Sequence, residues 1–211
     1  MLDFFINAYK NTPLHVIILE AIAFLFGIAS VYFAKKQNIW VYPTGLIATS
    51  ITVYLLYRAE YFGDMIINFY YSVMSIYGWY NWSQKDKDNN LLSVTRTSLK
   101  EKLIGVALFF LTIVVIFGVY KAYDYEIRTE NYFDILTAGI FFTAMWYMAL
   151  KKLESWPLWI IGNIIVIPLY AYRGLGMLSL QYIIFTILAV QAYVEWRKIL
   201  NSQRQSPELT S

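Results

Sequence analysis

The sequence predicts an all-α membrane protein with seven transmembrane helices. Of its 211 residues, 59% are apolar and only 15% are charged, and the mean hydropathy is +0.48. A soluble domain carries about 25% charged and about 45–50% apolar residues, and a chain of this size cannot bury so large an apolar excess in one core. The excess must face a lipid bilayer, which excludes most soluble classes, intrinsic disorder and a nucleic-acid-binding domain.

Seven windows along the chain have the composition of membrane spans, which need about 20 apolar residues to cross the hydrocarbon core. The first window, residues 14–34, contains one acid, Glu20. Six windows without Asp, Glu, Lys or Arg follow: 39–57, 65–82, 103–120, 135–150, 155–172 and 174–194. The window at 135–150 is the shortest, and we expect its helix to begin before Asp134.

The segments outside these windows are polar or only weakly apolar. Residues 1–11 suit a short helix on the membrane surface rather than a signal peptide. A polar loop, residues 83–102, separates the third span from the fourth. The tail from residue 201 to residue 211 is polar, and we expect it to be frayed.

The distribution of Lys and Arg predicts the orientation in the membrane. Seven spans place the termini on opposite sides, and the side of the C-terminus would carry twelve of the 17 Lys and Arg residues. Cytoplasmic loops of membrane proteins carry the excess of these residues. We therefore expect a multi-pass membrane protein with its N-terminus outside and its C-terminus in the cytoplasm.

The second and third spans resemble the sixth and seventh. Residues 80–83 (YNWS) can be aligned with 194–197 (VEWR), and residues 42–45 (YPTG) with 159–162 (WIIG). A three-helix unit needs one returning span before it can repeat in the same orientation, and seven is 3+1+3. The sequence thus predicts a single membrane domain over 1–211, built from two parallel three-helix bundles (12–82 and 132–198) and a linker helix (103–120). Some transporters have parallel repeats and bind substrate between them.

The sixth span contains the pattern W-x-x-W-x-x-x-N, formed by Trp156, Trp159 and Asn163. Trp159 and Asn163 are four residues apart and so share a helix face. Trp156 also fits a plain interfacial tryptophan. The buried amide of Asn163 needs partners, and a ligand carboxamide would supply both a donor and an acceptor. We expect these three residues to bind substrate.

Five further residues are candidates for the same site. Gln181 in the seventh span and Asn68 in the third lie at similar depths, and they either bond neighbouring helices or face a central cavity. Tyr70 and Trp79 could stack on a flat cationic ring, because aromatic faces attract cations. Glu20 is an acid within a span and hence a functional candidate, although a carboxylate near the interface, or a protonated one bonded to another helix, also fits.

The composition excludes several enzyme classes. The chain has no Cys and one His, so it has no thiolate nucleophile and no His metal cluster. We expect no catalytic residue, metal or cofactor, and a transporter rather than an enzyme. A membrane enzyme and a purely structural membrane protein are the alternatives. Pro43 and Pro168 interrupt the second and sixth spans, as hinges or as structural kinks.

At these residues the chain resembles the PnuC family of bacterial vitamin transporters. The stretch 76–82 (IYGWYNW) is similar to the family's YGWYxW, and 154–163 to its ExWxxWxxxN. Residues 178–182 (LSLQY) and 20–21 (EA) also match, and the resemblance covers roughly residues 19–196. It implies a SWEET-like fold and facilitated uptake of nicotinamide riboside across the bacterial inner membrane, with thiamine as the alternative substrate. It also implies that the chain can form a homotrimer.

Overall fold

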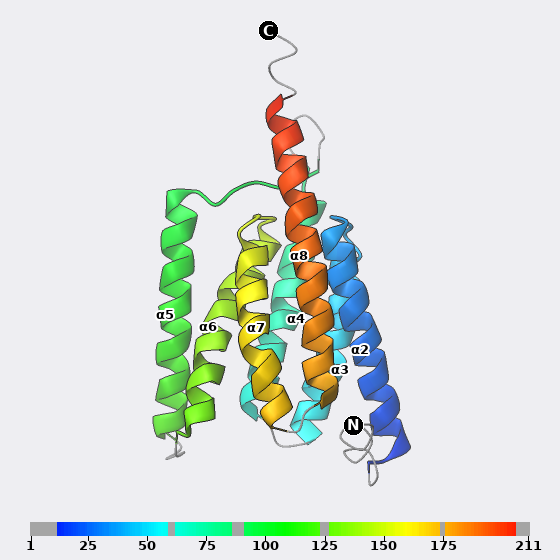
Figure 1. The fold of residues 1–211 in the computed structure, drawn as a ribbon, viewed down its shortest axis with the longest axis vertical. Coiled ribbons are helices and arrows are strands. Elements are labelled where there is room, and N and C mark those ends of the chain that lie inside the picture. Colours follow the sequence, from blue (N-terminus) through cyan, green and yellow to red (C-terminus); the bar gives the residue numbers. More distant parts are fainter. Residues whose placement is uncertain (1–11, 59–61, 86–90, 123–126, 174–175, 206–211) are drawn as a thin grey trace.

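The structure is a computed structural model that describes residues 12–58, 62–85, 91–122, 127–173 and 176–205. These residues contain seven α-helices (Figure 1). In chain order they are α2 (Leu14–Lys35), α3 (Val41–Arg58), α4 (Phe62–Ser83), α5 (Leu99–Ala122), α6 (Thr129–Ala149), α7 (Ser155–Tyr172) and α8 (Gly176–Gln205). Each predicted span corresponds to one of these helices. The predicted helix at residues 1–11 lies outside the described residues.

Five of the described helices are long and apolar enough to cross a membrane: α2, α5, α6, α7 and α8. The remaining two, α3 and α4, carry more hydroxyl side chains, and some of these face each other. The hydroxyls of Thr49 on α3 and Ser72 on α4 are 2.8 Å apart. The hydroxyl side chains lower the hydropathy of these two helices, and this pair shows one polar contact between them.

Three boundaries are informative. The helix α6 begins at Thr129 and so includes Asp134, as expected. The prediction of a frayed tail from residue 201 is wrong as far as Gln205, because α8 continues to that residue; nothing in this stretch breaks a helix, since it has no Gly or Pro. Pro43 does not interrupt its helix either, because α3 begins at Val41, and a first turn needs no N–H from proline. Pro168 does lie inside α7.

Six of the helices form a closed ring. In contact order the ring runs α2, α3, α4, α6, α7, α8 and back to α2. The helix α5 lies outside this ring and packs against α6 (Figure 1). Gly105 allows the close approach, because a Cβ there would collide with the Tyr147 ring. The Thr143 hydroxyl donates a hydrogen bond to the Gly105 carbonyl at 3.2 Å.

The hydrophobic core closes one end of the ring, where α2, α4 and α6 end and α3 and α7 begin. At its centre lie four buried aromatic side chains, which we call the tryptophan layer: Tyr42, Trp82, Trp156 and Trp196. Trp196 is 0% exposed. The C-terminal part of α8 projects beyond this end (Figure 1). Side chains from six elements thus block the ring at this end.

The tryptophan layer contains two equivalent ring contacts, one in each half of the chain. Tyr42 meets Trp82 edge-on at 5.1 Å, and Trp156 meets Trp196 edge-on at 5.3 Å. Tyr42 and Trp156 are 114 residues apart, and so are Trp82 and Trp196. This register differs by three residues from the alignment expected for residues 42–45, because the contacts equate Tyr42 with Trp156 rather than with Trp159.

The ends of α2 and α6 follow the same spacing. Gln37 and Lys151 both adopt left-handed backbone conformations, with φ of 53° and 56°. Their N–H groups bond the carbonyls of Ala34 and Met148. Each of those carbonyls also accepts an indole N–H from the other half of the chain, at 3.1 Å in both cases, Ala34 from Trp196 and Met148 from Trp82.

Candidate functional site

The helix α7 places Trp159 about one turn and Asn163 about two turns from the tryptophan layer. Trp159 stacks on Phe141 of α6, with ring centroids 5.4 Å apart and planes 28° apart. It also contacts Tyr71 of α4 at 6.2 Å. The indole of Trp159 therefore contacts aromatic side chains from two other helices, α4 and α6.

Asn163 is the most unusual polar residue in this region. It is only 2% exposed, and its side-chain Oδ1 has no hydrogen-bond partner among the described residues. A buried acceptor without a partner costs about 1–3 kcal/mol. The Asn163 Oδ1 can therefore accept a hydrogen bond from a bound ligand.

Aromatic rings continue the wall beside Asn163. Phe141 lies against Gly162, where any Cβ would collide with the ring. Tyr182 of α8 stacks on Phe141 at 6.2 Å and meets Tyr170 at 5.3 Å. The hypothesis built on the W-x-x-W-x-x-x-N pattern did not include Phe141, Tyr182 or Tyr71. The glycine at 162, beside the asparagine, is the one local signal of a close ring contact.

Gln181 lies where α8 meets α2. A Cβ on Gly27 would be 3.1 Å from the Gln181 Nε2 and 3.4 Å from the Phe185 ring. Gln181 thus points toward α2, with Phe185 one turn further along the same face. It belongs to the interface between the first and the last helix of the ring.

Trp156, the first tryptophan of the pattern, lies in the tryptophan layer. It is buried, and its Nε1 has no hydrogen-bond partner in the described part of the chain. The indole N–H and the Asn163 Oδ1 are an unpaired donor and an unpaired acceptor on the same helix. They lie seven residues apart, which is about 10 Å along the axis.

The predicted residues of α4 divide between two environments. Tyr70 stacks on Phe142 of α6 at 3.9 Å and donates its hydroxyl to the Phe142 carbonyl at 3.1 Å. Trp79 is 42% exposed, and Asn68 is half-buried. In the described structure it is Tyr71, next to Tyr70, whose ring contacts Trp159.

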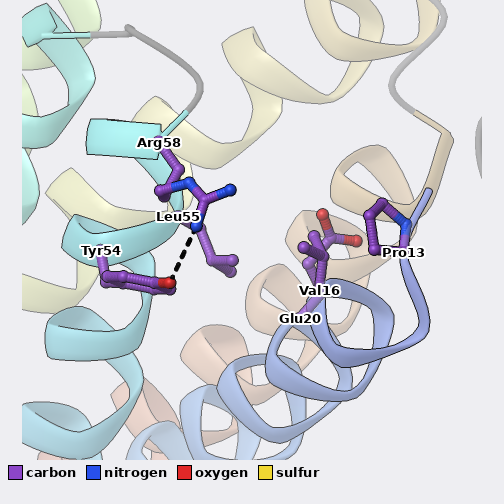
Figure 2. Close-up of a pocket in the computed structure, with 6 residues that line it drawn as sticks. All are labelled: Pro13, Val16, Glu20, Tyr54, Leu55 and Arg58. Carbon is purple, nitrogen blue, oxygen red and sulfur yellow. Dashed lines mark hydrogen bonds between the residues drawn. The ribbon is translucent and has the colours of Figure 1, made fainter.

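Glu20 lines a separate cavity of about 250 Å³ between α2 and α3. Figure 2 shows Pro13, Val16 and Glu20 on one wall and Tyr54, Leu55 and Arg58 on the other. The guanidinium of Arg58 donates to the Tyr54 hydroxyl at 3.3 Å. This cavity lies toward the opposite end of the ring from the tryptophan layer, so Glu20 is not grouped with Trp156.

Comparison with known proteins identifies the family of the chain. A family model described as nicotinamide mononucleotide transporter matches residues 17–198. The nicotinamide riboside transporter PnuC of Escherichia coli (strain K12) is 24% identical, with 97% of each chain covered. The transporter of the same name from Neisseria mucosa is 28% identical over 86% of this chain and 73% of its own.

A crystal structure of the vitamin B3 transporter PnuC has the same fold. Its TM-score is 0.73 at 24% identity, and the match covers 95% of this chain and 89% of that one. All these relatives are named transporters, in agreement with the prediction that the chain is not an enzyme. Because the family model matches most of its length, the chain belongs to the nicotinamide mononucleotide transporter family, whose members include the PnuC transporters.

Proposed function

We propose that the protein mediates facilitated uptake of nicotinamide riboside across the bacterial inner membrane. Its relatives carry the name of this substrate. The observation that carries the proposal is the unpaired, buried Oδ1 of Asn163, one turn from the stacked rings of Trp159 and Phe141. Nicotinamide riboside combines a flat cationic ring with a carboxamide, and these are the two groups that such a site can recognise.

Each part of the solute has a partner in this arrangement. The pyridinium ring stacks on the Trp159 indole, where a desolvated cation–π contact contributes about 2 kcal/mol. The carboxamide N–H donates to the Oδ1 of Asn163. Gln181 and the free indole N–H of Trp156 are left to bond the ribose hydroxyls. Binding then satisfies polar atoms that are unpaired in the described structure.

The surroundings favour the riboside over the mononucleotide. A buried phosphate needs cationic partners. The helices α4, α6 and α7 carry no Lys or Arg, and the first cation of α8 is Arg197 at the closed end. The Escherichia coli and Neisseria mucosa transporters are also named for the riboside. Neither of them is named for thiamine, so that alternative is not favoured.

Calorimetry on the detergent-purified protein tests the proposal. The wild type should bind nicotinamide riboside, and Asn163→Leu should lower the affinity by about tenfold to hundredfold, because the carboxamide loses a partner worth about 1–3 kcal/mol. Asn201→Leu makes the same replacement at an exposed position of α8 and should leave binding unchanged.

A substrate analogue makes the test more specific. Nicotinic acid riboside has a carboxylate in place of the carboxamide and offers no N–H to Asn163. The wild type should discriminate against this analogue, and Asn163→Leu should bind both ribosides about equally. Unchanged affinity of Asn163→Leu for nicotinamide riboside would contradict the proposed site.

The architecture and assembly are part of the same proposal. The reciprocal contacts at a spacing of 114 residues support two parallel three-helix bundles, 12–82 and 132–198, joined by α5 in a SWEET-like 3+1+3 arrangement. We place the closed end, with Lys35 and Lys36, in the cytoplasm and the cavity of Glu20 toward the outside. A homotrimer in the lipid bilayer remains a prediction from the family resemblance.

A further inference from the structure

Two seams close the ring at the end that holds the tryptophan layer. We define the α4/α6 seam by Asn81, Trp82 and Met148, and the α2/α8 seam by Ala34, Lys35 and Glu195. Each seam joins the first half of the chain to the second. These seams are the smallest contacts around the ring, so we take them as the two candidate exits for a solute bound at Trp159.

Neutral hydrogen bonds hold the α4/α6 seam, one from the half-buried Asn81 and one from the buried Trp82. The Asn81 amide donates to the Ala149 carbonyl at 2.8 Å, and the Trp82 indole donates to the Met148 carbonyl at 3.1 Å. Ala149 is fully buried. Bonds of this kind are costly to break where water cannot replace them.

A segment of the chain also crosses this seam. Residues 91–98 run from α4 toward α5 over the closed end (Figure 1). Thr95 exchanges backbone hydrogen bonds with Lys151 and Leu153, and the Thr97 N–H donates to the Glu154 carboxylate at 2.9 Å. We call residues 91–98 the strap. It ties the turn between α6 and α7 to the end of α4.

Lys151 strengthens this attachment. Its ammonium donates to the Leu92 carbonyl at 2.7 Å and lies 4.5 Å from the centre of the Trp82 ring. One side chain therefore connects the α6–α7 turn, the strap and the last turn of α4. The α4/α6 seam is held by backbone and side-chain bonds together.

The α2/α8 seam has the equivalent buried bond, because the Trp196 indole donates to the Ala34 carbonyl at 3.1 Å, but its remaining contacts are charged and lie nearer the surface. Glu195 forms ion pairs with Lys35 at 3.3 Å and with Lys36 at 3.8 Å. The Lys35 ammonium also donates a hydrogen bond to the Gln191 side-chain oxygen at 2.8 Å. About a third of the Glu195 side chain is exposed, so water and salt can replace these bonds at little cost. Within the described residues no loop segment spans this seam.

We propose that the closed end opens at the α2/α8 seam, that the ion pairs of Glu195 add to the Trp196 bond in holding this seam shut, and that the α4/α6 seam, which the strap crosses, stays closed during transport. Gln181 lies against Gly27 on the same pair of helices, so opening there leads directly from the candidate site to water. The inference rests on the proposed transport function, but not on which solute is carried.

Cysteine labelling can test the inference, because the natural chain contains no Cys. Ala34→Cys introduces a thiol at the α2/α8 seam, and Ala149→Cys introduces one at the α4/α6 seam; both alanines are buried. Each is labelled with a water-soluble maleimide in detergent, with and without Glu195→Gln. The charge-neutral variant should speed the labelling of Cys at 34 about two- to fivefold, as expected for the loss of a partly exposed ion pair, and leave Cys at 149 protected.

Three controls make the result decisive. Glu101→Gln removes another ion pair near this end, that with Lys152 at 2.8 Å, and should not change labelling at 34. Glu195→Asp keeps the charge and should restore slow labelling. Lys35→Gln removes the same seam contact from α2 and should reproduce the effect if Glu195→Gln folds poorly.

Two outcomes overturn the inference: equal acceleration at positions 34 and 149, or no acceleration at 34 in either seam variant. Calorimetry with nicotinamide riboside on the same samples separates the two proposals. Absence of binding in the wild type contradicts the proposed substrate, whereas the labelling ratio reports the seam whether or not a solute binds.

Discussion

Trp159 is the residue through which three helices of the ring meet at the candidate site. Its indole contacts Phe141 and Tyr71, so one side chain joins α7 to α6 and α4. Trp159→Ala should lower the affinity for nicotinamide riboside about tenfold or more, because the solute loses its stacking surface and a cation–π contact. Trp159→Phe should retain most of the affinity.

The matched control is Trp40→Ala. Trp40 is 58% exposed and lies just before α3, so its removal should change binding little. Calorimetry on variants with wild-type melting temperatures decides the comparison. A loss of affinity in Trp40→Ala as large as that in Trp159→Ala would indicate a general effect on folding.

At the same scale, the sequence predicts residue types better than the directions of side chains. Trp159 and Asn163 could be placed together because a fixed helical spacing relates them. Tyr70 and Tyr71 are neighbours, about 100° apart around α4, and composition does not say which one faces Trp159. The unpaired state of Asn163 depends on its tertiary surroundings and has no signal in the sequence.

At the scale of elements, the strap depends on a lysine in an unfavourable place. Burial lowers the pKa of Lys151 from its usual 10.5 to about 8. Between these two values the unfolded chain binds a proton that the folded chain does not. The free energy of unfolding should therefore rise with pH from about 8 to 10.5 through this group, and the cost of burying the charge is fully present below pH 8.

Thermal unfolding of the detergent-solubilised protein checks this dependence. The wild type should gain stability relative to Lys151→Met as the pH rises from 7.5 to 10, because the variant has no proton to lose. Identical pH profiles for the two proteins would show that Lys151 keeps its usual pKa. Lys85→Met, on an exposed residue near the strap, should match the wild type.

Helix boundaries were largely predictable because a lipid environment demands long uncharged segments. The seven windows locate all seven described helices to within a few residues at most ends. The extension of α8 to Gln205 and the place of Pro43 in a first turn were missed, since helix propensity and capping, not hydropathy, set those limits. The strap could not be predicted, because its bonds join segments far apart in the chain.

At the scale of the whole molecule, the charge distribution predicts the orientation. Twelve of the 17 Lys and Arg residues would lie with the C-terminus in the cytoplasm, where such residues are enriched. A green fluorescent protein fused after Ser211 should therefore be fluorescent in intact bacteria. A dark fusion at normal expression would reverse the proposed orientation and place the closed end outside.

The paired indole bonds of Trp82 and Trp196 have the form of an isologous interface, in which each partner offers the other the same contact. Such a surface is self-complementary. Two separately expressed halves, divided within the strap, should therefore be able to reassemble through these seams. The native chain can be viewed as a tethered heterodimer, in which the tether permits the two interfaces to diverge: both keep a buried indole bond, whereas one seam gains the strap and the Asn81 bond and the other gains the ion pairs of Glu195.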